Sequence, residues 1–308
     1  MNKMIGKVCL NYDDYSGNDF YSEGDIENVL LDIAENEHDR PLSEILSDHR
    51  SWSVLYHFSP QRENSVSWIP MKGDEKVLEI GAGCGAITGI LSEKAGSVTC
   101  VELSERRSMI NALRHREKEN IEIRIGNFLD VEKRLDNDFD VITLIGVLEY
   151  AGSYMNTDDP YTDLLKTVGK HLKKGGRLVI AIENRLGMKY LAGCAEDHTG
   201  VYFEGIEGYP VNKGVRTFDK PELEKLIRGS GYEGMEFYYP YPDYKLPTAV
   251  FSDDRLPLKG ELRDNINNFD HERLVLFNEA RAFDSLVEGG LFPIFSNSFI
   301  VIAQEENK

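Results

Sequence analysis

Residues 77–102 read VLEIGAGCGAITGILSEKAGSVTCVE, and this stretch decides the fold. It begins with a short apolar run that stops at Gly81, a pattern typical of a buried strand. The alternating glycines that follow let a backbone turn sharply and approach a ligand where a Cβ would clash. Residues 86–94 carry apolar side chains at helical spacing, so the loop opens a helix whose first N–H groups point toward the ligand. Residues 98–101 form a second strand that ends on Glu102, and the whole predicts half of a nucleotide-binding βαβ unit.

Two kinds of nucleotide fit this loop. The spacing Gly81-x-Gly83-x-x-Ala86 satisfies the dinucleotide pattern G-x-G-x-x-G/A. Glu79 favours a different ligand, because an acidic residue just before the loop would repel a pyrophosphate and suits a cationic ligand end better. A carboxylate at Glu102 can accept both hydroxyls of a ribose, and this suits either nucleotide.

The stretch VLEIGAGCG resembles, at every position, the first motif of the class I S-adenosylmethionine (SAM) methyltransferases, (V/I)-L-(E/D)-(I/L/V)-G-x-G-x-G. Residues 172–180, LKKGGRLVI, resemble a second motif of that family, L-K-P-G-G-x-L-(V/I)-I. The resemblance implies an α/β fold with a doubly wound, seven-stranded, mostly parallel sheet whose last strand is antiparallel beside the sixth. It also implies SAM as the cofactor and S-adenosyl-L-homocysteine as the product. The cofactor-binding residues that it implies are Glu79, Gly81, Ala82, Gly83, Gly85, Glu102, Leu103, Asn127, Phe128 and Arg62.

The rest of the chain is predicted to surround this domain. Residues 1–70 form an N-terminal helical extension or cap, and residues 71–308 form the SAM-binding domain. Insertions at 185–216 and 241–292 are long and weakly regular, as lids and binding loops usually are. Arg62, in the extension, either pairs with the cofactor's carboxylate or faces solvent. Further strands are predicted at 121–125, 140–146, 172–184, 236–239 and 297–303, and helices at 104–118, 161–172 and 218–229.

Three residues are candidates for the chemistry. Transfer of a methyl group to a hydroxyl also requires removal of its proton, and open α/β sheets bind ligands at the carboxyl ends of their strands. Glu149 and Tyr150 follow the fourth strand, and Tyr150 replaces a histidine that the family often has there. His198 lies beside Asp197, whose carboxylate can fix an imidazole tautomer and raise its basicity. The alternative for His198 is a histidine that satisfies backbone groups in a glycine-rich turn.

Composition limits the possible partners. The chain has 35 Lys and Arg against 53 Asp and Glu, a net charge of −18, which argues against a nucleic-acid partner. The four cysteines have no C-x-x-C spacing, so no metal site and a reducing compartment are predicted. The longest apolar run, at 141–148, is far shorter than the roughly 20 residues that span a bilayer. We therefore expect no membrane segment and a cytoplasmic location, while the oligomeric state is unknown.

The flanks carry a second resemblance. AIENRLGMKYLAGCAEDHTG at 181–200 and YYPYPDYKLP at 238–247 look like uncharacterised SAM-dependent methyltransferases that accompany bacterial genes for cell-surface polysaccharides and glycosyltransferases. Together the resemblances imply a methyltransferase for a small-molecule or carbohydrate-like (glycan-like) acceptor. Two alternatives stay open: an NAD-dependent oxidoreductase, because of the dinucleotide spacing, and a non-catalytic SAM-binding partner protein.

Overall fold

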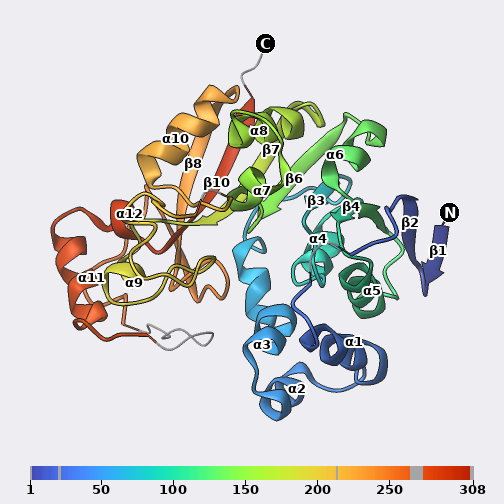
Figure 1. The fold of residues 1–308 in the computed structure, drawn as a ribbon, viewed down its shortest axis with the longest axis horizontal. Helices are drawn as coiled ribbons and strands as arrows, with labels where there is room; N and C mark the ends of the chain where they lie inside the picture. Colours follow the sequence, from blue (N-terminus) through green and yellow to red (C-terminus); the bar gives the residue numbers. More distant parts are fainter. Residues whose placement is uncertain (1, 20–21, 213, 264–272, 306–308) are drawn as a thin grey trace. The chain divides into compact units, whose positions relative to one another are not determined.

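The computed structural model describes residues 2–19, 22–212, 214–263 and 273–305 (Figure 1). The strands among them are β1 (Asn2–Ile5), β2 (Val8–Asp14), β3 (Lys76–Ile80), β4 (Ser97–Glu102), β5 (Ile121–Gly126), β6 (Phe139–Ile145), β7 (Leu172–Glu183), β8 (Tyr232–Tyr241), β9 (Ala249–Ser252) and β10 (Ser298–Glu305). These strands form one sheet in the order β1-β2-β5-β4-β3-β6-β7-β10-β8-β9. The predicted number of seven is therefore wrong. The described part of the sheet has ten strands, because β1 and β2 extend one edge and β9 the other.

Most helices fall in the predicted places. They are α1 (Ile26–Asn36), α2 (Leu42–His49), α3 (Trp52–Phe58), η1 (Pro60–Ser65), α4 (Thr88–Lys94), α5 (Glu105–Arg114), α6 (Phe128–Val131), η2 (Glu132–Arg134), η3 (Leu148–Tyr150), α7 (Ala151–Tyr154), α8 (Pro160–Gly169), α9 (Met188–Leu191), α10 (Lys220–Gly229), α11 (Glu279–Glu288) and α12 (Phe292–Phe295). None of these helices is both long and apolar enough to cross a membrane.

Two predicted helices end too late. The helix predicted to reach 172 ends at Gly169, because Leu172 already belongs to β7 and pairs into the sheet. The helix predicted to reach 118 ends at Arg114 and is followed by a turn, in which Lys118 N–H donates to His115 O at 2.8 Å. In both cases the predicted helix was continued past the residue at which the helical backbone ends.

The chain forms two compact units. Unit 1 comprises Met1–Thr143 and His171–Gly176, and unit 2 comprises Leu144–Lys170 and Arg177–Lys308. The predicted boundary at residue 70 lies inside unit 1, and the predicted division into an extension and a methyltransferase domain stays a prediction. The predicted insertion at 241–292 includes residues 264–272, which lie outside the described residues.

Unit 1 contains an unpredicted hairpin at the edge of its sheet. Ile5 pairs with Val8 across a two-residue turn that begins at Gly6, whose φ is +57°. β2 then runs parallel to β5, with Leu10 opposite Ile123. Val8 and Leu10 are completely buried, so the alternation of apolar residues in β2 is that of a half-buried strand.

The N-terminal helices of unit 1 pack beside the glycine loop. Their apolar side chains form one core cluster with Cys84 of the loop and Ile110 of α5. The other buried members are Leu30, Ile33, Ala34, Ile45, Val54 and Phe58. Helical character was predicted for residues 1–70, and α1 to α3 carry it, whereas the first fourteen residues contain the hairpin.

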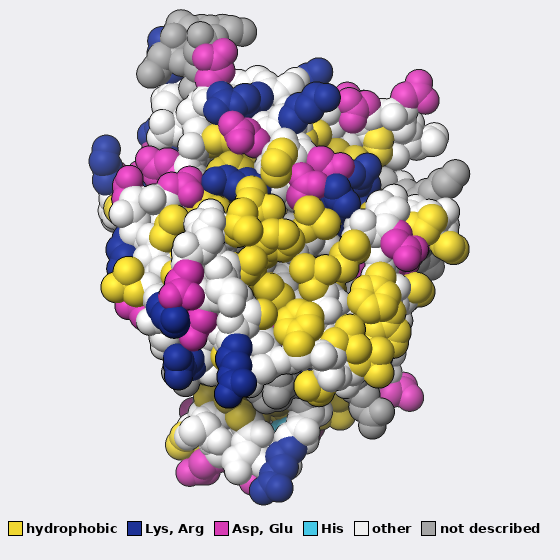
Figure 2. Space-filling view, turned by 90° about the vertical axis from the view of Figure 1, so that its left-hand side faces the viewer, with side chains coloured by type: hydrophobic (Ala, Val, Ile, Leu, Met, Phe, Trp, Pro, Cys, Tyr) yellow, Lys and Arg dark blue, Asp and Glu magenta, His cyan; other side chains and the backbone are white. Residues whose placement is uncertain are grey.

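Unit 2 contains the predicted closing strand. β10 is antiparallel to both of its neighbours, with Phe299 opposite Ile182 of β7 and Val301 opposite Phe237 of β8. On one face of the molecule hydrophobic side chains gather among charged ones (Figure 2). Exposed large hydrophobic side chains of unit 2 include Leu258, Val275, Phe277 and Leu291.

Candidate active site

The loop between β3 and α4 has the backbone that its glycines predict. Gly81, Gly83 and Gly85 have φ of +74°, +54° and +76°, in the left-handed region that favours glycine. Gly81 N–H donates to Val101 O at 2.9 Å and thereby attaches the loop to β4. A Cβ added to Gly85 would lie 2.3 Å from Asn111 Oδ1, whereas one added to Gly83 would meet no atom of the described residues within 4 Å. Open space therefore lies beside Gly83, as a ligand that approaches the backbone requires.

Glu102 connects this loop to the end of β4. Its Oε2 accepts a hydrogen bond from Gly83 N–H at 2.8 Å, and its Oε1 accepts one from Ser104 N–H at 2.9 Å. Burial raises the pKa of Glu102 above its ordinary value of 4.5, and the positive charge of Arg107 acts in the opposite direction. Leu103, between the two bonded segments, is partly exposed. The loop and the acid that were predicted to hold the cofactor are thus in direct contact.

Glu79 lies beneath the loop and is 2% exposed. Thr88 Oγ1 donates to its Oε2 at 2.7 Å, and Cys100 Sγ lies 3.4 Å from the same oxygen. Burial raises the pKa of Glu79 to about 7. A cationic ligand beside this carboxyl would favour its ionised form, because an opposite charge stabilises the carboxylate.

Asn127 and Phe128 follow the strand next to β4. Glu102 of β4 lies opposite Ile125 of β5, and Asn127 and Phe128 follow Ile125 after a single glycine. The Asn127 side chain caps α6 by accepting from Leu129 N–H at 2.9 Å. The Phe128 ring lies 6.4 Å from the His171 ring, edge to face. Their contacts with the cofactor stay a prediction.

The alternative prediction, in which Arg62 faces solvent, is wrong. Its side chain is buried, its guanidinium lies 4.3 Å from the Tyr56 ring centroid, and its Nη2 donates to the Tyr56 hydroxyl at 3.4 Å. The sequence did not indicate the arginine that contacts the loop itself. Arg114 Nη1 donates to Cys84 O at 2.5 Å and to His57 O at 2.7 Å. A single basic residue in a charge-rich helix carries no spacing signal for such a contact.

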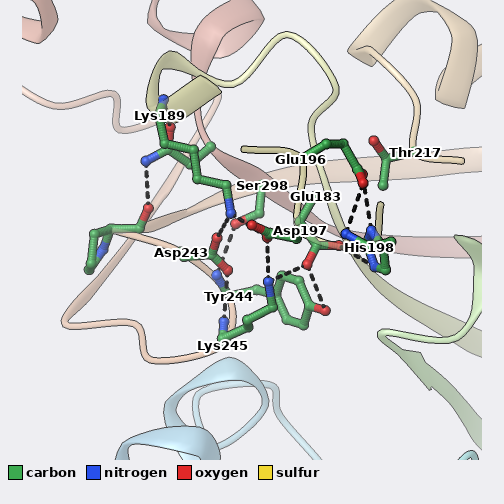
Figure 3. A network of polar contacts seen from close by, with 12 residues as sticks. Glu183, Lys189, Glu196, Asp197, His198, Thr217, Asp243, Tyr244, Lys245 and Ser298 are labelled. Carbon is green, nitrogen blue, oxygen red and sulfur yellow. Dashed lines mark hydrogen bonds and ion pairs between the residues drawn. The ribbon is translucent and has the colours of Figure 1, made fainter. Parts of the chain in front are cut away.

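All ten predicted cofactor residues lie in unit 1, and the three predicted catalytic residues lie in unit 2. In unit 2, His198 is surrounded by carboxylates (Figure 3). Its Nδ1 lies 3.1 Å from Glu196 Oε1. Its Nε2 lies 3.6 Å from Glu149 Oε1 and 3.9 Å from Glu183 Oε2. The Tyr150 ring lies 5.4 Å from the imidazole, edge to face.

The prediction that Asp197 orients His198 is wrong. Glu196 orients the imidazole instead. Its carboxylate is held in place because it also accepts hydrogen bonds from the backbone N–H groups of His198 and Thr199, each at 2.8 Å. Such a local turn points Glu196 back at the imidazole two residues later. Asp197 instead contacts Lys189 Nζ at 2.6 Å and Lys245 Nζ at 2.5 Å.

The pKa values of both His198 and Glu149 are raised, for different reasons. Burial disfavours a charge on His198, but Glu183, Glu149 and Glu196 outweigh it and raise the pKa of His198 well above 6.5. Burial raises the pKa of Glu149, and His198 acts in the opposite direction. The Glu149 side chain is 1% exposed, and its Oε2 has no hydrogen-bond partner among the described residues. The carboxylates therefore favour the protonated imidazole, and Glu149 Oε2 accepts no hydrogen bond from the described residues.

The sequence did not single out Glu183 or Lys245. Glu183 Oε1 contacts Lys245 Nζ at 2.5 Å and accepts from the Tyr244 hydroxyl at 3.4 Å. Glu183 ends the apolar run of β7 just as Glu102 ends that of β4, and this shared pattern was the available signal. The next residue, Asn184, donates its amide N–H groups to Ile294 O and Ser296 O.

Comparisons with known proteins agree with the fold and the loop. A family model described as a methyltransferase domain matches residues 78–178. An uncharacterized methyltransferase of Staphylococcus carnosus is 31% identical over 196 residues, which cover 59% of this chain and 86% of that protein. The chain therefore belongs to the SAM-dependent methyltransferases, a family of enzymes that use SAM as the methyl donor.

More distant relatives are similar over part of their length. The ubiquinone biosynthesis O-methyltransferase of Pseudomonas syringae pv. tomato is 25% identical over 150 residues, which cover 46% of this chain and 62% of that protein. The match thus spans less than two thirds of that curated relative. A chain in the solved complex between the Haloferax volcanii Trm112 methyltransferase activator and a methyltransferase aligns with a TM-score of 0.50 and 14% identity. That alignment covers 93% of this chain and 99% of the other, and it shows a shared fold.

Proposed function

We propose that this chain transfers the methyl group of SAM to a hydroxyl oxygen of a small, carbohydrate-like acceptor. The observation that carries the proposal is Glu149 Oε2, a buried carboxylate oxygen without a hydrogen-bond partner among the described residues. A hydroxyl acceptor needs a group that takes its proton, and a carboxylate whose pKa is raised by burial suits that role.

The cofactor residues of unit 1 fit the proposed donor. Positive φ at the glycines and open space beside Gly83 leave the cradle that a Cβ would fill. In our proposal the loop backbone holds the methionyl part, Glu102 the ribose, Asn127 and Phe128 the adenine, and Arg62 the carboxylate. When bound, SAM supplies the methyl group as an electrophile on a sulfonium.

In our proposal, residues of unit 2 accept the proton of the acceptor hydroxyl and position the group that accepts it. Glu149 Oε2 would accept the proton of the acceptor hydroxyl, whose oxygen would receive the methyl group that bound SAM supplies. His198, as an imidazolium, stabilises the ionised form of Glu149 before the transfer. Glu196 fixes the imidazole through Nδ1, so Nε2 faces Glu149.

The charge of the cluster favours a neutral acceptor. Phosphorylated acceptors would be repelled, because carboxylates outnumber ammonium groups in this network. Neutral polyols can instead donate their hydroxyls to carboxylate oxygens. The carboxylates are Glu149, Glu183, Glu196, Asp197 and Asp243, and the ammonium groups are those of Lys189 and Lys245.

Two further arguments bear on the alternatives. Transfer to oxygen is consistent with the printed name of the Pseudomonas relative, an O-methyltransferase. Because the chain belongs to the methyltransferases, the NAD-dependent oxidoreductase is set aside as an alternative. A SAM-binding protein without catalysis would have no need for a buried, unpartnered carboxylate oxygen, whose desolvation costs stability. A role in polysaccharide biosynthesis belongs to the proposal and rests on the flanking stretches alone.

Turnover with a panel of acceptors tests the proposal. The chain is incubated with SAM and neutral sugars, sugar phosphates or phenols, and formation of S-adenosylhomocysteine is measured. We expect turnover with a neutral hydroxyl acceptor, and a loss of kcat of about 100-fold or more in Glu149→Gln with unchanged cofactor affinity. Glu224→Gln on the exposed face of α10 is the matched control. Full activity of Glu149→Gln would overturn the assignment of the base, and cofactor binding without turnover on any acceptor would favour the non-catalytic alternative.

A further inference from the structure

Three buried side chains of unit 2 present ligand atoms to a common point. One ligand atom from each of Glu149, Glu183 and His198 lies within 4.8 Å of the other two. The side chains are 1%, 0% and 7% exposed, respectively. We propose that these three residues bind a divalent transition-metal cation. The site goes beyond the proposed function, because cation binding is measured without methyl transfer.

The distances around His198 Nε2 fit metal ligands better than hydrogen bonds. Glu149 Oε1 at 3.6 Å and Glu183 Oε2 at 3.9 Å are both beyond ordinary hydrogen-bond length. Two ligands that each bind one cation at about 2.0–2.2 Å lie about 3.0–3.5 Å apart in tetrahedral or octahedral geometry. The two nitrogen–oxygen distances exceed this range by a few tenths of an ångström, and all three ligand atoms lie within 4.8 Å of one another.

An independent observation points to a ligand at this position. Glu183 Oε2 is buried and has no hydrogen-bond partner among the described residues. The other oxygen of the same carboxylate is held by Lys245 and by the Tyr244 hydroxyl. Because buried polar atoms are normally paired, an unpaired carboxylate oxygen that faces an imidazole nitrogen is a place for a cation.

The surroundings have the arrangement of an outer coordination shell. Metal-binding histidines commonly give their second ring nitrogen to a carboxylate, which fixes the ring and its tautomer. Glu196 Oε1 has this position, 3.1 Å from His198 Nδ1 (Figure 3). Binding through Glu149 Oε1 would leave Glu149 Oε2 available for the acceptor's proton, and the cation would replace the Nε2 proton of His198 as the positive charge beside Glu149.

Charge also favours a cation. The network of Figure 3 with Glu149 contains five carboxylates, against two ammonium groups and one imidazole. Lys189 and Lys245 pair with Asp197, and Lys245 also pairs with Glu183, so three carboxylates and one ammonium group lie around His198. Buried charges of one sign are costly, and a divalent cation would compensate two of them.

The donor set selects the kind of metal. Carboxylates suit Mg²⁺, Ca²⁺ and Mn²⁺, and imidazole suits Zn²⁺, iron and other transition metals. One imidazole with two carboxylates therefore favours Mn²⁺, Zn²⁺ or Fe²⁺ over Ca²⁺ or Mg²⁺. Three protein ligands leave coordination positions open, as in catalytic rather than structural sites.

Titration of the chelator-treated full chain tests the site. Mn²⁺ and Zn²⁺ are added separately and followed by calorimetry, and Mn²⁺ also by its electron paramagnetic resonance signal. We expect one bound ion per chain and a loss of affinity of about 10-fold or more in Glu183→Gln and in His198→Ala. Glu196→Gln, which removes the outer carboxylate, should lose about 10- to 100-fold. Glu224→Gln, whose carboxylate pairs with Arg228 on α10, serves as the unaffected control.

The possible outcomes separate this inference from the proposed function. Absence of saturable binding by the folded wild type, or unchanged affinity in Glu183→Gln, would overturn the metal site. Should His198→Ala fail to fold, Glu183→Gln and the Mn²⁺ resonance of the wild type decide. Turnover that persists in chelator, with no ion bound, would reject the cation and leave the methyltransferase proposal intact. Metal binding without turnover on any acceptor would support the metal site and count against the methyltransferase proposal.

Discussion

Glu196 Oε1 lies 3.1 Å from Nδ1 of His198, two residues further along the chain. The same carboxylate accepts the backbone N–H of His198, so side chain and backbone of the histidine are fixed together. Asp197, between them, serves other partners and contacts Lys189 and Lys245. Two adjacent acids thus have separate roles, and substitutions can distinguish them.

Glu196→Gln and Asp197→Asn should therefore fail in different ways. We expect Glu196→Gln to lower kcat by about 10- to 100-fold with a small change in stability, because it loosens the imidazole. Asp197→Asn should lower the free energy of unfolding by about 3–5 kcal/mol, because it leaves the buried ammonium groups of Lys189 and Lys245 without their shared carboxylate. Turnover assays and urea unfolding of both variants measure these effects. Equal losses of stability in the two variants would contradict the division of roles.

Gly83→Ala and Gly85→Ala should also differ. A Cβ at Gly85 would lie 2.3 Å from Asn111 Oδ1, so we expect Gly85→Ala to lower the free energy of unfolding by more than about 2 kcal/mol. Gly83 has open space around it, so Gly83→Ala should cost only the left-handed backbone strain of about 1–2 kcal/mol. Its Cβ would nevertheless fill the proposed cofactor cradle. Calorimetry with S-adenosylhomocysteine should therefore detect weak binding by a folded Gly83→Ala, and full affinity would show that the ligand lies elsewhere.

Glu102→Gln tests the proposed ribose contact. Loss of hydrogen bonds to a charged group should weaken binding of S-adenosylhomocysteine by about 1–3 kcal/mol, or about 5- to 150-fold. Asp138→Asn is a suitable control, because that exposed acid of unit 1 pairs with Lys76 on the surface. Isothermal titration of the two variants and the wild type gives the comparison. Identical affinity in all three would remove Glu102 from the site.

Glu79 predicts a dependence of stability on pH. Burial raises its pKa from 4.5 to about 7, so between these values the folded protein holds a proton that the unfolded chain has released. Rising pH therefore favours unfolding, and the contribution of Glu79 to stability is complete below pH 4.5 and lost as pH rises to about 7. At about 1.4 kcal/mol per pKa unit, the loss is about 3 kcal/mol.

Glu79→Gln should abolish this dependence. Urea unfolding of the wild type and the variant at about pH 5 and about pH 8 should show a change of about 2–3 kcal/mol in the difference between their free energies of unfolding. Thr88 and Cys100, which contact the carboxyl, are the same in both proteins, so the subtraction isolates Glu79. A difference that does not vary with pH would mean that Glu79 is ionised in the folded protein throughout.

Local signals in the sequence predicted the loop and the strands on either side of it. Gly81, Gly83 and Gly85 each require a positive φ, and a positive φ is a property of one residue and its neighbours. The hairpin of β1 and β2 was missed because its apolar alternation, at Val8 and Leu10, is short and lies beside a segment rich in turn residues.

The candidate site of unit 2 was predicted in part. Glu149, Tyr150 and His198 were identified by their positions after a strand and in an insertion, and the structure brings these three together. Glu183 and Lys245 are far apart in the sequence, and no spacing rule connects them. The choice between Glu196 and Asp197 depended on the backbone of one turn, which composition and periodicity do not determine.

The place of β10 in the sheet has a consequence for synthesis on the ribosome. β8 is made before β10, yet β10 lies between β7 and β8 and pairs with both. Until Ser298–Glu305 have been translated, β8 lacks the neighbour that joins it to β7, and the apolar faces of this part of the sheet remain uncovered. The glycine loop and its strands are complete much earlier, so a nascent chain could hold a folded unit 1 while unit 2 still depends on chaperones.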